Sequence, residues 1–89
     1  MVDTANKFSL WAIEIFVASV EEGSISAAAK RLNSSNSTIS QQLTNLEAAL
    51  GSELLDRSTR PMKLKPTGQL FLHRARAILS EVIRWFGCD

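Results

Sequence analysis

Apolar positions along the chain recur at spacings of three and four residues, which is the period of an amphipathic α-helix. The first such run predicts a helix over about 9–22, which Gly23 ends. Its apolar positions are Leu10, Ile13, Phe16, Val17 and Val20. A short second helix should follow, because Ser24 or Ser26 can cap its first turn and Asn33 tolerates the positive φ of a turn.

A third amphipathic run predicts a helix over about 36–50, capped by Ser35 or Asn36 and ended by Gly51. One face of this helix is aliphatic and consists of Ile39, Leu43, Leu46 and Leu50. The opposite face carries amides and hydroxyls, and its members are Asn36, Ser37, Ser40, Gln41 and Thr44. A helix of this kind is half buried, and its uncharged polar half suits directional hydrogen bonding.

The remainder of the chain predicts a small hairpin and a long helix. Segments 53–57 and 62–65 are expected to be short strands, and Pro66 then opens a helix over about 67–86. A seam with heptad-like spacing runs along this helix, namely Phe71, Ala75, Ile78, Val82 and Trp85. A second stripe beside it consists of Leu72, Leu79, Ile83 and Phe86. Either stripe alone could simply belong to the core. Together they lead us to expect one stripe on the first helix and the other on a second subunit, and we assign the heptad-like seam to dimerisation.

The composition is that of one small domain. The chain has 89 residues, of which 45% are hydrophobic and 21% are charged. The core of so short a chain is small, so burial shared with a second copy would help it. We find no run long and apolar enough to span a membrane and no signal-peptide pattern, so a cytoplasmic location is expected. The single cysteine, Cys88, can form no internal disulfide.

The net charge of +1 hides an uneven distribution of charges. From Asp56 to Arg76 there are six basic residues and one acid, and from Ser24 to Leu46 there are two basic residues and no acid. The acids collect elsewhere, at Glu14, Glu21, Glu22, Glu47 and Glu53. One surface can therefore be positive and attract a polyanion.

The polar face of the third helix supplies candidates for reading DNA. Asn36 and Gln41 can bond bidentately to adenine, although Asn36 could instead be a helix cap and Gln41 a solvated amide. Ser37 and Thr38 lie in the first turn, where free N–H groups and the helix dipole attract phosphate. Ser40 can bond either phosphate or the helix backbone.

Basic residues around this helix supply candidates for holding DNA. Arg60 at the tip of the hairpin can enter a narrow minor groove, with a solvated loop arginine as the alternative. Arg57 can bind DNA or can form an internal ion pair that fixes the hairpin. The other expected phosphate contacts are Lys30, Arg31, Lys63 and Lys65.

The sequence argues against catalysis. It has no nucleophile with an accompanying base, no paired carboxylates and no glycine-rich phosphate loop. His73 has no Cys, His or acidic neighbour at metal-ligand spacing. We therefore expect neither an enzyme nor a metal or other cofactor.

The order of helices, turn, hairpin and long helix resembles the N-terminal DNA-binding domain of LysR-type transcriptional regulators. The residues that carry the resemblance are 16–18, 22–29, Leu32, 40–47, 50–51, 54–57 and 66–68. They are spread over most of the chain, and their combined spacing is highly specific.

The resemblance implies a mainly α fold, a winged helix-turn-helix with three helices, a short β-hairpin wing and a long C-terminal linker helix. It implies a DNA-binding domain at 1–66 and a linker and dimerisation helix at 67–89. It further implies a dimer on an inverted-repeat operator in double-stranded DNA, with helix 36–50 in the major groove and wing 54–65 on the backbone and minor groove. The regulator would be prokaryotic, would act at the nucleoid, and would bind an inducer only through a C-terminal domain outside these residues.

This chain departs from the usual pattern of the family at the third helix. Asn36, Ser37 and Gln41 stand where Gln, Pro and Arg are common, so fewer long basic side chains face the groove. The base preference of relatives therefore cannot be copied to this chain. An alternative from another class is a winged-helix protein-interaction module that does not recognise specific DNA.

Overall fold

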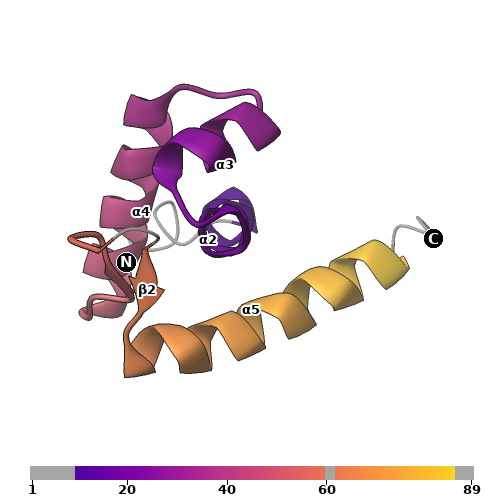
Figure 1. Cartoon of the computed structure of the whole chain (residues 1–89). Helices are drawn as coiled ribbons and strands as arrows, with labels where there is room; N and C mark the ends of the chain where they lie inside the picture. The colour runs from indigo at the N-terminus through magenta and orange to yellow at the C-terminus, as the bar shows by residue number, and fades with distance from the viewer. Residues whose placement is uncertain (1–9, 60–61, 86–89) are drawn as a thin grey trace.

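A computed structural model describes residues 10–59 and 62–85 of the chain. Its elements are α2 (Leu10–Glu22), α3 (Ile25–Arg31), α4 (Asn36–Leu50), β1 (Leu55–Asp56), β2 (Lys63–Leu64) and α5 (Pro66–Trp85). Helices α2, α3 and α4 form one group, and α5 passes beneath this group and extends away from it (Figure 1). The predicted order of elements and the mainly α fold are confirmed.

Helix α2 supplies the largest share of the core because its apolar residues cover more than one face. Its buried side chains include Ala12, Ile13, Ile15, Phe16, Val17 and Ala18. Helix α4 adds its aliphatic face, and α3 adds Ala28 and Ala29, whose small side chains let that helix approach closely. The one buried polar side chain among the described residues, Ser19, donates its hydroxyl to the Ile15 carbonyl at 2.8 Å. The core therefore carries no unsatisfied hydroxyl at that position.

Two serines fix the starts of the helix-turn-helix. The Ser24 hydroxyl accepts from the Ala27 N–H at 3.1 Å, and the Ser35 hydroxyl accepts from the Thr38 N–H at 3.2 Å. Ser24 and Ser35 are thus the caps, and the alternatives Ser26 and Asn36 are not. Between the two helices Asn33 has a φ of +56°, as predicted for a short amide side chain in a turn.

The hairpin is shorter than the predicted strands. Antiparallel β1 and β2 pair Leu55 with Leu64 and Asp56 with Lys63. Beyond this ladder the Met62 N–H bonds the Gly23 carbonyl at 3.1 Å, which ties the start of the second strand to the α2–α3 turn. This bond takes the Met62 N–H away from the ladder, and β2 spans Lys63–Leu64 rather than the predicted 62–65.

Helix α5 starts in close contact with the hairpin. The Thr67 hydroxyl donates to the Glu53 carbonyl at 2.7 Å. At Gly68 an added Cβ would lie 2.1 Å from the Leu54 carbonyl oxygen, so only glycine fits at this approach. The base of the wing and the first turn of α5 therefore form one packed unit.

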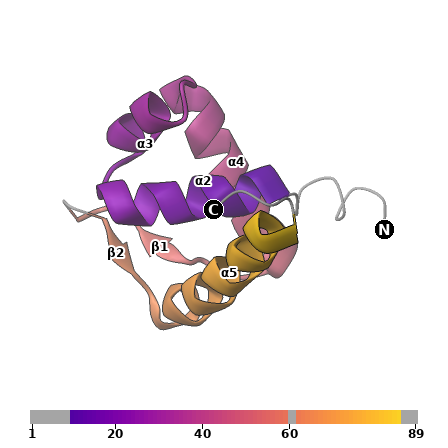
Figure 2. The same cartoon turned by 90° about the vertical axis from the view of Figure 1, so that its right-hand side faces the viewer.

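The structure corrects the assignment of the heptad-like seam on α5. Ala75 is fully buried inside the protomer, and the Phe71 ring packs edge-on against Phe16 with centroids 5.2 Å apart. Leu72 and Leu79 of the second stripe pack against the same core. Figure 1 and Figure 2 show α5 crossing α2 on the side opposite α3. The boundary between the two stripes faces α2, so residues of both stripes pack into this core.

The outer edges of the two stripes remain exposed. Ile78 is 39% exposed and Ile83 is 52% exposed, whereas Val82 is half-buried. Trp85 ends α5, but its side chain lies outside the part of the chain that the structure describes, as does Phe86. Of the predicted dimer contacts with described side chains, Ile78 and Val82 thus remain available.

The described residues, 10–59 and 62–85, contain no helix with the length and apolar character needed to cross a membrane.

Candidate nucleic-acid interface

One side of α4 is free of tertiary packing, and we call it the outer face of α4. Its members are the exposed Ser37, Gln41, Thr44 and Ala48 with the half-buried Thr38 and Asn45. The opposite side holds the helix to α2 through buried leucine and isoleucine side chains. The whole helix, Asn36–Leu50, contains no lysine or arginine, and its one acid is Glu47. The outer face is therefore an uncharged hydrogen-bonding surface on a firmly anchored helix.

The first turn of α4 leaves two backbone donors free. Ser35 takes the Thr38 N–H and also donates its own hydroxyl to the Thr38 hydroxyl at 2.9 Å. The N–H groups of Asn36 and Ser37 precede the intrahelical ladder and have no acceptor among the described residues. These donors and the exposed Asn36 side chain stand at the positive end of the helix dipole, which suits an anion.

The predicted base readers lie at the surface. Asn36 is the first residue of α4 rather than its cap, so its amide is not committed to the helix backbone. Gln41 is exposed and donates an N–H to the Asn45 side-chain oxygen at 3.1 Å. Ser40 is half-buried and has no hydrogen bond to the described backbone that would support the alternative given above. The DNA contacts of these residues stay predictions.

A half-buried carboxylate joins α4 to the wing. One oxygen of Glu47 accepts the N–H groups of Leu54 and Leu55 at 2.8 and 3.3 Å, and the other accepts from the Arg57 guanidinium at 3.1 Å. Only 15% of the Glu47 side chain is exposed, compared with 32% of Arg57. The internal ion pair proposed as the alternative for Arg57 is therefore present.

Sequence reasoning gave Glu47 no role of its own. The available signal was a lone carboxylate on an otherwise uncharged helix, but nothing in the sequence shows that it points at the wing. Its three partners lie seven to ten residues further along the chain, beyond the end of the helix.

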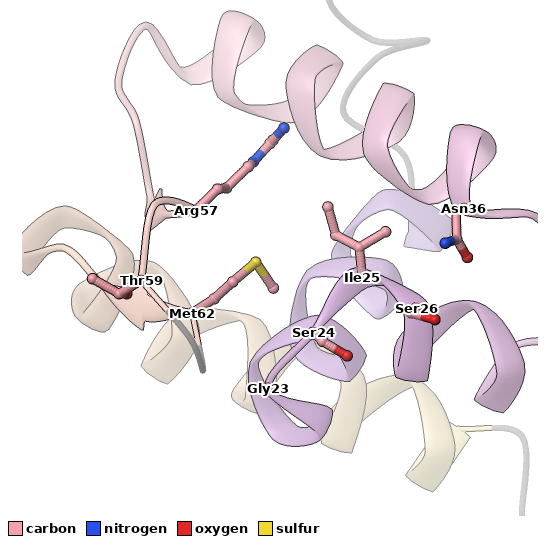
Figure 3. Close-up of a pocket in the computed structure, with 8 residues that line it drawn as sticks. All are labelled: Gly23, Ser24, Ile25, Ser26, Asn36, Arg57, Thr59 and Met62. Carbon is pink, nitrogen blue, oxygen red and sulfur yellow. The ribbon is translucent and has the colours of Figure 1, made fainter.

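A hollow of about 380 Å³ separates the first turn of α4 from the wing. It is lined by Gly23, Ser24, Ile25, Ser26, Asn36, Arg57, Thr59 and Met62. Figure 3 shows Asn36 at one end and Arg57 extending toward α4 at the other, with Ile25 and Met62 between them. The amide and the guanidinium thus stand on opposite sides of an apolar floor.

Two further predicted phosphate contacts are held by acids. Arg31 bonds Glu21 at 2.8 Å and Glu22 at 3.3 Å, and Arg76 bonds the other Glu21 oxygen at 3.2 Å. The hydrogen bond from Arg31, followed by that from Arg76, lowers the pKa of Glu21. This cluster joins α2, α3 and α5, and it turns Arg31 toward α2.

Lys65 is the second of these two predicted phosphate contacts. It bonds Glu53 at 2.7 Å, and this contact raises the pKa of Lys65 and lowers that of Glu53. Lys30 and Lys63 are exposed and have no salt bridge within the described residues. Arg60 lies outside the described residues, so its predicted contact remains untested. The cations open to DNA on the described surface around α4 therefore include Lys30 and Lys63.

The described residues contain no cluster of three His, Cys, Asp or Glu side chains that could hold a metal ion. His73 is exposed on α5.

The helix-turn-helix geometry agrees with a comparison of the sequence with protein families. The model of the bacterial regulatory helix-turn-helix proteins of the lysR family matches residues 10–69, more than half of the chain.

The chain belongs to the LysR family.

Relatives within the LysR family match most of this chain. A probable hydrogen peroxide-inducible genes activator of Mycobacterium xenopi is 39% identical over 82 residues, which are 92% of this chain and 43% of that protein. The regulator BenM of Acinetobacter baylyi is 43% identical over 70 residues, which are 79% of this chain and 23% of BenM. The chain thus spans less than half the length of these relatives.

Solved structures from the LysR family share the fold. The DNA-binding domain of BenM in complex with catB site 1 DNA superposes with a TM-score of 0.86 at 39% identity, covering 89% of this chain and 85% of that one. The DNA-binding domain of CbnR in its DNA complex gives a TM-score of 0.84 at 40% identity, covering 89% and 91%. The winged helix-turn-helix predicted from the sequence is thereby confirmed. LysR-family members are transcription regulators rather than enzymes.

Proposed function

We propose that this chain is a sequence-specific DNA-binding domain of a bacterial transcription regulator. In this proposal α4 enters the major groove, and the wing lies on the backbone and the adjoining minor groove. Residues 1–66 form the DNA-binding unit, and 67–89 form the linker and dimerisation helix. The DNA complexes of the BenM and CbnR domains support the proposal, because these domains share the fold over nine-tenths of this chain.

The single observation that carries the proposal is the outer face of α4. It presents amides and hydroxyls in a continuous stripe, while buried aliphatic side chains fix the opposite face. A major groove admits one α-helix, and base edges are read there by amide and hydroxyl groups. Free N–H groups at the start of α4, together with Lys30 and Lys63 nearby, supply backbone contacts that set the register.

In this proposal dimerisation uses the exposed part of the heptad-like seam together with apolar side chains outside it. The exposed apolar side chains of α2 and α5 include Leu10 and Trp11 on α2 and Ile78 and Ile83 on α5. Between these helices lies an open hollow of about 280 Å³, lined in part by Leu10, Val82 and Ile83. An apolar surface of this kind favours burial against a second copy, which would place two α4 helices on half-sites about one helical turn apart.

The test of this function is a selection of bound DNA from a random duplex library at near-physiological salt. We expect an enriched inverted repeat, bound on the order of 10³-fold more tightly than a scrambled duplex. Equal binding of all sequences, lost as salt rises, would instead be the behaviour of the interaction-module alternative.

The dimer surface has its own test with a matched control. Ile83→Asp should weaken self-association in sedimentation and should reduce binding to the inverted repeat more than binding to a single half-site. Leu70→Asp is the control, because Leu70 is 61% exposed on the same helix but lies on another side of it. Equal loss with both variants would show that the defect is not specific to the proposed surface.

A further inference from the structure

We propose that Gln41, positioned by Asn45, makes α4 select an A·T base pair at one place in each half-site. This inference rests on the proposed function and assigns a base preference to it. Three features of the outer face of α4 support this selection: the missing basic residues, the hydrogen-bonding state of Gln41, and the methyl group of Thr44.

Helix α4 has no side chain that matches guanine. In the major groove guanine offers two acceptors, O6 and N7, and the side chains that match them are arginine and lysine. Helix α4 has neither between Asn36 and Leu50, and its Glu47 carboxylate is turned inward to the wing. The helix therefore lacks the side chains that would favour a G·C pair at its centre.

The amide of Gln41 keeps one donor and one acceptor for a base. A glutamine amide has two N–H donors and one carbonyl oxygen. One donor is used by the Asn45 oxygen at 3.1 Å, which leaves one donor and the oxygen. Adenine presents one acceptor, N7, and one donor, the N6 amino group, in the major groove. The groups that Gln41 has left thus complement adenine, whereas guanine would need a second donor.

Asn45 also restricts the motion of Gln41. The two residues are four positions apart on one side of α4, and Asn45 is half-buried while Gln41 is exposed. A long side chain that is already held loses less conformational entropy on binding. Asn45 is therefore a positioning residue, and Gln41 is the residue that contacts the base.

Thymine, the partner base of adenine, offers a second group for contact. Thymine carries a C5-methyl group in the major groove, and a threonine methyl is one of the groups that contact it. Thr44 is exposed and lies three positions after Gln41, on the same outer face. A pair with adenine under Gln41 can place its thymine methyl near Thr44, so both bases of the pair are recognised.

The first experiment repeats the DNA selection with the Gln41→Arg variant of the chain. We expect the wild type to enrich A·T at one position of each half-site, and the variant to enrich G·C at that position with the other positions unchanged. A wild-type preference for G·C there, or no position that responds to the variant, would overturn the base assignment while leaving the proposed function intact. No enriched sequence for the wild type would overturn both.

The second experiment uses modified bases in the enriched duplex, with affinity measured by fluorescence anisotropy. Replacing the adenine by 7-deazaadenine removes N7 and should weaken wild-type binding about 5- to 150-fold, the range for a bidentate base contact. The same replacement should have little effect on Gln41→Ala, which has already lost the contact. An equal loss in both proteins would contradict a contact between Gln41 and N7.

Thr44 and Asn45 are tested against a matched control. Replacing the paired thymine by uracil should weaken the wild type but not Thr44→Ser. Asn45→Ala should reduce the discrimination between A·T and G·C several-fold while binding to scrambled DNA is kept. Gln42→Ala is the control, since Gln42 is a half-buried amide off the outer face, and it should leave the discrimination unchanged. If Gln42→Ala lowers discrimination as much as Asn45→Ala, the positioning role is wrong.

Discussion

The outer face of α4 and the charged framework around it use polar side chains in opposite ways. We use the term charged framework for Glu21, Glu47 and Glu53 together with their basic partners. In the framework each carboxylate bonds a cation, at 2.8, 3.1 and 2.7 Å, and the cations come from other elements. On the outer face, apart from the cap formed by Ser35 and Thr38, the described side chains form one hydrogen bond, between Gln41 and Asn45. The framework positions the helix, and the face is left open for a partner.

This difference shows why basic residues alone are a poor guide to a DNA surface. Arg31, Arg57 and Lys65 were all candidate DNA contacts, yet each bonds an acid of its own chain. An ion pair satisfies part of the hydrogen-bonding capacity of such a cation and fixes its direction. The uncharged amides of α4 are more informative, because little in the protein uses them.

The largest expected effect is at Glu47. Glu47→Ala removes the acceptor of two backbone N–H groups at the base of the wing, and each donor left unsatisfied costs about 1–3 kcal/mol. We expect the free energy of unfolding to fall by about 2–4 kcal/mol in urea denaturation. Glu47→Gln keeps one oxygen acceptor and should lose less. A loss no greater than that of Glu53→Ala, an exposed pair member, would show that Glu47 does not hold the wing.

Gly68 tests the packing at the base of the wing rather than its charges. Gly68→Ala would drive a Cβ into the Leu54 carbonyl oxygen, which is backbone and cannot rotate aside. Unfolding measurements should show destabilisation near the upper end of the roughly 1–3 kcal/mol that overpacking costs. Gly51→Asn is the control: Gly51 has open space around it and a φ of +71°, which asparagine tolerates. Similar losses for the two variants would contradict the close approach.

Lys63 and Gln41 separate backbone contacts from base contacts. If Lys63 neutralises a phosphate, Lys63→Ala should weaken binding to all sequences alike and reduce the slope of log K against log salt by about 0.9. Gln41→Ala should weaken binding to the selected site and leave the slope unchanged. A titration of affinity against salt for both variants measures this. An unchanged slope for Lys63→Ala would remove Lys63 from the set of phosphate contacts.

The smallest expected effect is at Glu21. Hydrogen bonds from Arg31 and Arg76 lower the pKa of Glu21 in the folded state, so its contribution to stability is present above the ordinary value of 4.5 and is lost as pH falls through the lowered pKa. The carboxyl is partly exposed, and surface ion pairs contribute about 0.2–1 kcal/mol each. Thermal melts should show Glu21→Gln less stable than the wild type at pH 7, and the difference should shrink as pH falls below 4.5. A difference that does not change with pH would point to a cause other than the charge.

The helices could be predicted closely from the sequence. The predicted ranges 9–22, 36–50 and 67–86 correspond to Leu10–Glu22, Asn36–Leu50 and Pro66–Trp85. Helical periodicity reports burial of one face, and the capping serines and glycines act within a turn of their own positions. The hairpin was less predictable, because the bond between the Met62 N–H and the Gly23 carbonyl joins residues far apart in the chain.

The exposed residues of the candidate site could be predicted from the sequence, but the ion pairs of its charged residues could not. The exposed positions of Ser37, Gln41 and Thr44 follow from the aliphatic face opposite them. The partners of Arg31 and Arg57 lie ten residues away, and Arg76 is 55 residues from Glu21. A sequence pattern does not give such distances in space.

Local spacing and composition are enough to predict the helix-turn-helix, the family and the uncharged face of α4. Packing in three dimensions settles which cations are held by acids and which residues of α5 belong to the core. The physical reason in both cases is the position of one segment against another: the wing against α4 for Glu47 and Arg57, and α5 against α2 for the core. A different rotation of α5 about its axis would place Ile78 rather than Ala75 in the core, and periodicity alone does not fix that angle.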